Sequence, residues 1–188
     1  MSILKVARMG HPVLREECKA IDPKAITGPE VQRLIRDMFE TMAEYNGVGL
    51  AAPQVHQPIR LVIAGGDADE QGRPSFRVLI NPEITVLNEE EQLGMYEGCL
   101  SVPGMRGWVE RPAAISVKAY NEKGQLQEFS LEGFPAVVMQ HECDHLDGVL
   151  YVDRIEDMTR FGYDEEASRY LDVAGEEFDE DPEDYPED

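Results

Sequence analysis

Apolar residues recur at helical spacing near the beginning of the chain. They are Val31, Leu34, Ile35, Met38, Phe39 and Met42. This spacing places them on one face of a helix that extends to about Tyr45. Just before them, Thr27 and Glu30 fit a capping box, in which both side chains accept hydrogen bonds from free backbone N–H groups. The pattern predicts an amphipathic helix that packs on a sheet.

Short β-branched and apolar runs follow this helix and predict strands. They cover residues 59–64, 76–80, 84–87, 114–120 and 125–131. The last two runs flank Asn121-Glu122-Lys123-Gly124, a sequence typical of a hairpin turn. The middle of the chain is therefore expected to be mostly antiparallel sheet.

A second helix is expected from about Pro135 to Asp147. Proline suits the first turn of a helix, and Gly148 suits the position just after its end. This helix carries the segment His141-Glu142-Cys143-Asp144-His145, an HExxH motif. The predicted fold class is α+β, with antiparallel sheets packed around a central helix that bears HExxH and with an N-terminal amphipathic helix.

Composition and charge narrow the class of protein. The net charge of −21 and the lack of a basic stripe argue against direct nucleic-acid binding. No apolar run approaches the roughly 20 residues of a membrane helix, and Lys5 and Arg8 interrupt the apolar residues of the amino end. Cys18, Cys99 and Cys143 are too few for a disulfide framework. We expect a cytoplasmic protein that binds no membrane.

The acidic residues are concentrated at the carboxyl end. Of the last fourteen residues nine are acidic and none is basic. Such composition favours a disordered, solubilising segment. We therefore expect one catalytic domain over residues 1–165 and an acidic, disordered tail over residues 166–188.

The HExxH motif predicts a metal site, because its two imidazoles project from one face of the helix. The third ligand has three candidates. A metzincin protease would have histidine where this chain has Tyr151, although Gly148 fits that pattern. A gluzincin protease would use a later acid, such as Glu165 or Glu166. The third candidate is Cys99, whose thiolate would bind iron or zinc well, although Cys99 could equally be a small buried residue.

Three segments together resemble the signature motifs of peptide deformylases, in the order of that family. They are Gly47-Val48-Gly49-Leu50-Ala51-Ala52-Pro53-Gln54, Glu97-Gly98-Cys99-Leu100-Ser101 and Gln140-His141-Glu142-Cys143-Asp144-His145-Leu146-Asp147-Gly148. Residues 11–15 also resemble the family's amino-terminal start. The resemblance covers about residues 5–163, and the acidic end suggests a divergent branch of the bacterial type.

The resemblance implies that Cys99, His141 and His145 bind the metal. Glu142 would be the general base that takes a proton from a metal-bound water and returns it to the departing amine. The reaction would remove the formyl group from N-formylmethionine at the start of nascent polypeptides and release formate. The expected ion is Fe2+, for which Zn2+, Ni2+ or Co2+ can substitute.

The resemblance also implies which groups hold the substrate. The Gln54 side-chain amide and the Leu100 backbone N–H would stabilise the oxyanion. Further residues expected along the bound peptide are Gly47, Val48, Gly49, Gly98, Arg106 and Val137, of which Val48 and Val137 are candidates for the methionine pocket.

Neighbouring charges have expected roles as well. Glu97 and Arg111 are expected to form a supporting ion pair, and Asp144 to orient a ligand histidine or cap a loop. Because the chain ends in acids, any contact with the ribosome is not expected to use a basic carboxyl-terminal helix. A different class of function, a metal-dependent binding module with this fold, is disfavoured because every position with a chemical role is filled.

Overall fold

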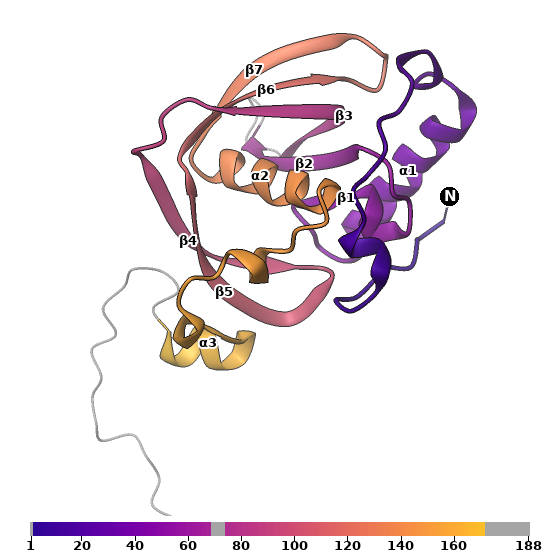
Figure 1. The fold of residues 1–188 in the computed structure, drawn as a ribbon. Helices are drawn as coiled ribbons and strands as arrows, with labels where there is room; N and C mark the ends of the chain where they lie inside the picture. The colour runs from indigo at the N-terminus through magenta and orange to yellow at the C-terminus, as the bar shows by residue number, and fades with distance from the viewer. Residues whose placement is uncertain (1, 69–73, 172–188) are drawn as a thin grey trace, which may run out of the picture.

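The computed structural model describes residues 2–68 and 74–171 (Figure 1). Its helices are α1 (Pro29–Glu44), α2 (Phe134–Leu146) and α3 (Asp164–Tyr170). Its strands are β1 (Gly49–Ala51), β2 (Leu61–Ala68), β3 (Pro74–Val86), β4 (Gln92–Cys99), β5 (Val102–Pro112), β6 (Ala114–Tyr120), β7 (Leu126–Glu132) and β8 (Phe161–Tyr163). The α+β class is confirmed.

The larger sheet has five antiparallel strands in the order β1-β2-β3-β6-β7. The two predicted strands over residues 76–80 and 84–87 are parts of the single strand β3. Its pairing with β6 shifts between Ile80 and Glu83, where Asn81 adopts a positive φ of 52°. The predicted hairpin is confirmed between β6 and β7, with Gly124 at φ +73°.

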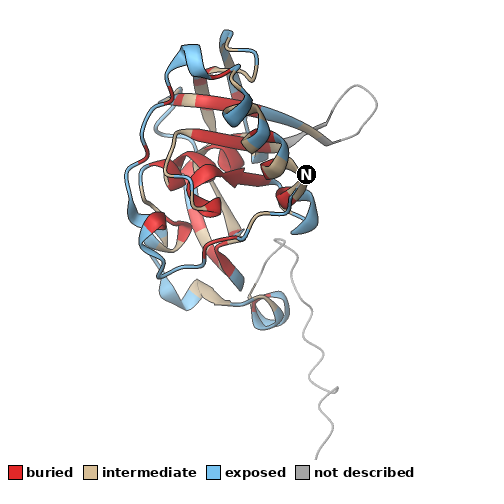
Figure 2. Cartoon of the chain, turned by 90° about the vertical axis from the view of Figure 1, so that its right-hand side faces the viewer, coloured by how far each residue is buried: buried red, intermediate tan, exposed pale blue. Residues whose placement is uncertain are grey.

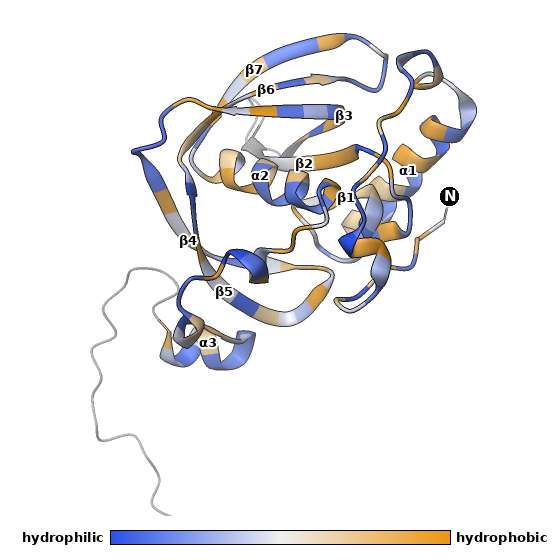
Figure 3. Cartoon of the chain, viewed as in Figure 1, coloured by the Kyte–Doolittle hydropathy of each residue, from blue (hydrophilic) through white to orange (hydrophobic). Residues whose placement is uncertain are grey.

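The two long helices cover opposite faces of this sheet. Side chains alternate along a strand, so Leu61 and Ile63 of β2 pack in a cluster with Met38 of α1. Val62 of β2 packs on the other face with Met139 of α2. Because β2 is buried on both faces, its first residues form a continuous apolar run (Figure 3). Figure 2 shows that the buried residues are concentrated in these central strands and in α2.

The start of α1 differs from the prediction. The helix begins at Pro29 after an N-cap at Gly28, and no side chain caps it, so the predicted capping box of Thr27 and Glu30 is wrong. Proline fits the first helical position because it lacks an N–H that would need a partner, and its φ is already helical. The Gly28 carbonyl then accepts the first helical hydrogen bond, from Gln32.

Helix α2 lies between the larger sheet and a second, three-stranded sheet of order β4-β5-β8 (Figure 1). The helix closely follows its predicted range, and Gly148 just beyond it has φ +71°. The backbone of Arg15 passes so close to Gly148 that a Cβ there would lie 2.8 Å from the Arg15 carbonyl carbon. Glycine is thus needed at position 148 for two reasons: its φ is positive, and the Arg15 backbone leaves no room for a Cβ.

The carboxyl-terminal part of the described chain folds back on β5. Strand β8 pairs with β5, and α3 follows at Asp164. Helix α3 crosses the expected boundary at residue 165, and the rest of the expected tail from residue 172 lies outside the described residues. No helix in the described ranges is long and apolar enough to span a membrane.

Candidate metal centre and active site

Three metal-binding side chains meet where the end of β4 faces α2. Cys99 is the last residue of β4, and His141 and His145 lie one helical turn apart on α2. One donor atom of each lies within 4.8 Å of the others, and the Cys99 Sγ is 3.3 Å from the His145 Nε2. Two imidazoles and a sulfur suit iron or zinc, and three protein ligands are typical of catalytic sites.

The other candidates for the third ligand lie elsewhere. Tyr151 is buried and stacks on the His141 ring, with 6.0 Å between ring centroids. Its hydroxyl donates to the Met105 carbonyl at 3.1 Å. Glu165 and Glu166 are exposed on α3. The geometry therefore favours Cys99 over both protease-type alternatives.

The histidine environment fits a bound cation. Burial, with the nearby positive charges of His141 and Arg111, lowers the pKa of His145 well below its usual range, which keeps the ring neutral as a ligand must be. The His145 Nδ1 is buried without a hydrogen-bond partner in the described part of the chain. Burial would lower the pKa of His141 too, but hydrogen bonds with Cys99 and Glu97 raise it well above its usual range. A metal bound at His141 must therefore displace a proton from its ring, whereas the His145 ring is already neutral.

Glu97 orients the first ligand histidine from behind. Its Oε2 lies 2.7 Å from the His141 Nδ1, which leaves the other ring nitrogen for the metal. Arg111 donates to both Glu97 oxygens, at 2.5 and 3.0 Å, so the expected ion pair is confirmed. Burial would raise the pKa of Glu97, but the hydrogen bonds from His141 and Arg111 lower it to about 2. Glu97 is therefore a firmly charged acceptor.

Of the two roles expected for Asp144, that of orienting a ligand histidine is wrong, because the acceptor of His141 is Glu97 and the His145 Nδ1 has no hydrogen-bond partner among the described residues. Its carboxylate instead accepts from Arg111 at 2.8 Å and from Arg154 at 2.5 Å. These partners lie on β5 and on the 3₁₀ turn Tyr151–Arg154 after α2, whereas the partners of the ligand histidines, Glu97 and Cys99, lie on β4. Asp144 therefore supports Arg111, which in turn holds Glu97.

Glu142 lies beside the three ligands as a buried carboxylate. Its side chain is only 4% exposed, and its Oε2 has no hydrogen-bond partner among the described residues. Burial raises the pKa of Glu142 to about 7. The carboxylate lies against Gly49, where a Cβ would be 2.3 Å from the Glu142 Oε1. A group of this kind can both accept and donate a proton near neutral pH.

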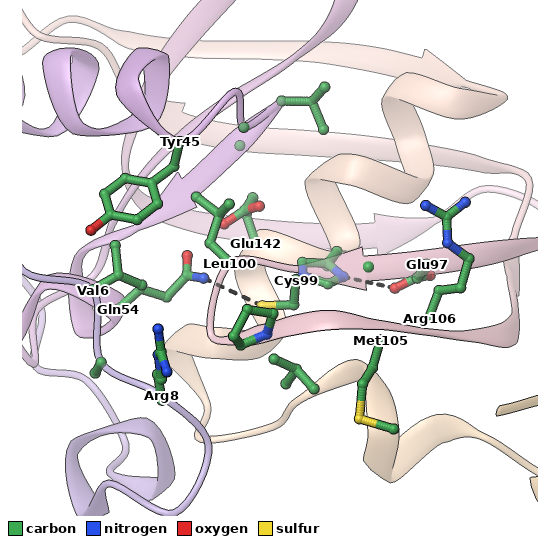
Figure 4. Close-up of a pocket in the computed structure, with 18 of the residues that line it drawn as sticks. Val6, Arg8, Tyr45, Gln54, Glu97, Cys99, Leu100, Met105, Arg106 and Glu142 are labelled. Atoms are coloured by element: carbon green, nitrogen blue, oxygen red, sulfur yellow. Dashed lines mark hydrogen bonds and ion pairs between the residues drawn. The ribbon is translucent and has the colours of Figure 1, made fainter. Parts of the chain in front are cut away.

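Gln54 occupies the other side of the cluster, on a 3₁₀ turn (Ala52–Val55) after β1. Its Oε1 accepts from the Ala51 N–H at 2.8 Å, and its Nε2 lies 3.4 Å from the Cys99 Sγ (Figure 4). The Nε2 also lies 3.2 Å from the Ser101 Oγ. Ser101 was not among the predicted site residues. It is fully buried, and its N–H donates to the Cys99 Sγ at 3.4 Å.

A cleft of about 1330 Å³ opens over these groups. Its lining includes every predicted site residue except His145, which lies buried beneath it: Gly47, Val48, Gly49, Gln54, Gly98, Cys99, Leu100, Arg106, Val137, His141 and Glu142. Arg106 is held at the rim by Asp164, with the Nε 2.6 Å from the Oδ1. In the described sheets β1 and β4 are edge strands, and both border the cleft.

Residues from the amino end also line this cleft and were missed by the sequence analysis. Lys5, Val6 and Arg8 belong to it, as does Tyr45 at the end of α1. They come from segments that carry no motif, so only the tertiary fold reveals their place.

The fold and this site define a metal-dependent hydrolase of the HExxH type. Comparison with known proteins identifies the family. The family model described as "Polypeptide deformylase" matches residues 3–161. A peptide deformylase of Leptospira biflexa serovar Patoc is 44% identical over 180 residues, which are 93% of this chain and 98% of that protein. Peptide deformylase 1 of Bordetella pertussis is 46% identical over 164 residues, 85% of this chain and 92% of that protein.

Solved structures agree with this comparison. The Met-Ala-Ser-bound class I type b peptide deformylase from Acinetobacter baumannii has a TM-score of 0.75 at 37% identity, and the match covers 82% of this chain and all of that one. Peptide deformylase from Thermotoga maritima has a TM-score of 0.74 at 39% identity, covering 84% of this chain and all of that one. The chain belongs to the polypeptide deformylase family and is a metal-dependent hydrolase that removes N-formyl groups.

Proposed function

We propose that the chain deformylates N-formylmethionyl nascent polypeptides, with Glu142 as the general base and acid beside a ferrous ion held by Cys99, His141 and His145. The observation that carries this proposal is the environment of Glu142. Its carboxylate is buried next to the three ligands, one of its oxygens has no partner among the described residues, and its pKa is raised to about 7.

Glu142 moves the proton in this scheme. A divalent ion held by Cys99, His141 and His145 would supply a Lewis acid for the formyl carbonyl and would lower the pKa of a coordinated water to about 7. Glu142 accepts the proton of the attacking water and later donates it to the departing methionine amine. The contact with Gly49 fixes the carboxylate in place, so little reorganisation is needed at the moment of transfer.

Gln54 and Leu100 stabilise the negative charge that develops on the formyl oxygen. The bond from the Ala51 N–H to the Gln54 Oε1 fixes the orientation of the amide, and its Nε2 then points toward Cys99. The backbone N–H of Leu100, directly after the ligand Cys99, is the second donor. A fixed donor of this kind typically contributes about 2.7–4 kcal/mol to transition-state stabilisation.

The peptide adds as a strand at the start of β1, along Gly49 and the two residues before it, Gly47 and Val48, with Gly98 on the facing edge. Val137, which is 2% exposed at the base of the cleft, contacts the methionine side chain together with Val48. The solved relative from Acinetobacter baumannii that carries Met-Ala-Ser supports a methionyl peptide as the ligand of this cleft.

The setting of the reaction is the cytoplasm, where formylated chains emerge. Helix α3 has three acids in its first turn, Asp164, Glu165 and Glu166, so contact with the ribosome does not use a basic helix of this segment. The nitrogen and sulfur donors accept Zn2+, Ni2+ or Co2+ in place of Fe2+.

The proposal is tested by hydrolysis of formyl-Met-Ala-Ser with iron-loaded protein kept free of oxygen. We expect one formate per methionyl peptide, no cleavage of unformylated Met-Ala-Ser, and loss of formate release after chelation that added metal restores. Cleavage of internal peptide bonds without formate would overturn the proposal and favour a zincin-type protease. Metal analysis of protein purified without oxygen tests the choice of iron.

A further inference from the structure

Two cations line the active cleft without an ion-pair partner in the described part of the chain. They are Lys5 and Arg8, and both are exposed. The chain as a whole carries a net charge of −21. The active cleft therefore carries two unpaired positive charges, although the chain as a whole is strongly negative.

The other charged side chains of the cleft are already neutralised or buried. Glu97 is paired with Arg111 behind the metal ligands, and Arg106 is paired with Asp164 at the rim. Glu142 is 4% exposed. The charges that remain open to a ligand in the cleft are therefore positive.

Arg8 is held firmly beside the reaction centre. The N–H of Ala7, on one side of it, donates to the Gln54 carbonyl at 2.7 Å, and the N–H of Met9, on the other, donates to the Ser101 carbonyl at 2.7 Å. Ala7 itself is 2% exposed and packs under the amino-terminal turn. In Figure 4 Arg8 lies on the same side of the cleft as Gln54 and Val6. The backbone of Arg8 is thus fixed between the two loops that flank the ligand Cys99.

We propose that Arg8, assisted by Lys5, selects formylated peptides that carry aspartate or glutamate at the second or third residue. This inference rests on the proposed function and adds a substrate preference to it. A guanidinium can bind a carboxylate through two parallel N–H donors, and its anchored backbone limits the freedom lost on binding. One solvent-exposed ion pair of this kind favours the acidic peptide by about three- to fivefold at low salt.

The test compares kcat/KM for matched pairs of C-terminally amidated peptides with the metal-loaded full chain. The pairs are formyl-Met-Asp-Ala against formyl-Met-Asn-Ala, and formyl-Met-Ala-Asp against formyl-Met-Ala-Asn. We expect one pair to show the three- to fivefold preference for aspartate at low salt, and this preference to shrink toward one at high salt. The salt series needs no variant and therefore does not depend on whether a variant folds.

Variants assign the preference to Arg8. Arg8→Gln should bring the aspartate-to-asparagine ratio close to one, and Arg8→Lys should retain part of it. The matched control is Lys123→Gln, which removes the same charge from the exposed β6–β7 turn outside the cleft and should keep the wild-type ratio.

Formate release without any preference for aspartate would overturn this inference and leave the proposed function in place. A wild-type ratio in Arg8→Gln would overturn the role of Arg8. No formate from any of the peptides would overturn both proposals.

Discussion

Gly49→Ala should displace the catalytic carboxylate without unfolding the chain. A Cβ at Gly49 would lie 2.3 Å from the Glu142 Oε1 and 2.7 Å from its Cδ, whereas ordinary contacts begin at 3.4 Å. The carboxylate would therefore have to move by about 1 Å, and a misplacement of this size can lower the rate about 100-fold. We expect kcat/KM for formyl-Met-Ala-Ser to fall by that factor while the bound metal per chain stays the same.

The Tm of the variant distinguishes a displaced carboxylate from an unfolded chain. One extra methyl group in a packed site costs about 1–3 kcal/mol, and each kcal/mol lowers the Tm of a domain of this size by about 2–4 °C. Gly162→Ala is the matched control, because no atom lies within 4 Å of a Cβ there and Gly162 does not line the cleft. Wild-type kcat/KM in a folded Gly49→Ala variant would refute the placement of Glu142 against Gly49.

Three further predictions concern the surrounding groups. Gln54→Ala should lower kcat by about 10²–10³-fold at unchanged metal content, and a smaller loss would argue against its role as an oxyanion donor. Glu97→Gln should weaken metal binding by about 10–100-fold in a chelator competition, because His141 loses its charged acceptor. The hydrogen bond from Arg15 lowers the pKa of Asp153, so the stability that this carboxylate contributes is present above its ordinary pKa of 3.8 and is lost as the pH falls below it. The difference in unfolding free energy between wild type and Asp153→Asn should therefore shrink from pH 5 to pH 3, and a constant difference would contradict the assignment.

Local patterns predicted the elements that depend on local sequence. The apolar spacing of α1 and the stop at Gly148 after α2 are properties of single segments, and the structure confirms both. The cap of α1 was predicted wrongly because Pro29 and Gly28 together fit the helix start better than Thr27 and Glu30 do. Strand β3 was divided in two because the turn-favouring Asn81 and Pro82 interrupt its apolar residues without ending the strand.

The third metal ligand could be named from the sequence only through the resemblance to a family. Periodicity places His141 and His145 on one helix face, but Cys99 lies 42 positions before His141 and reaches it only through the packing of β4 on α2. The hydrogen-bond acceptor of the His141 ring could not be predicted from neighbouring residues in the sequence either. Asp144 is near in sequence and points elsewhere, whereas Glu97 is distant in sequence and lies 2.7 Å away.

The β4–β5 hairpin was not predicted as strands, for a physical reason. Most residues of β4 are half-buried, and glycines at positions 94 and 98 weaken the β-sheet signal. The positions of Lys5 and Arg8 follow from the same tertiary arrangement, because both reach the cleft from a segment without a motif. Ser101 closes the motif around Cys99, but only the fold shows that its Oγ lies 3.2 Å from the Gln54 Nε2.

The most direct test of the central claim compares Glu142→Gln with wild type at equal metal content. Glutamine has nearly the shape of glutamate, so the fold, the contact with Gly49 and the three metal ligands should be preserved. We predict the same metal per chain and a loss of about 10²–10⁴-fold in kcat for formate release from formyl-Met-Ala-Ser. A metal-loaded Glu142→Gln protein that releases formate at the wild-type rate would contradict the account.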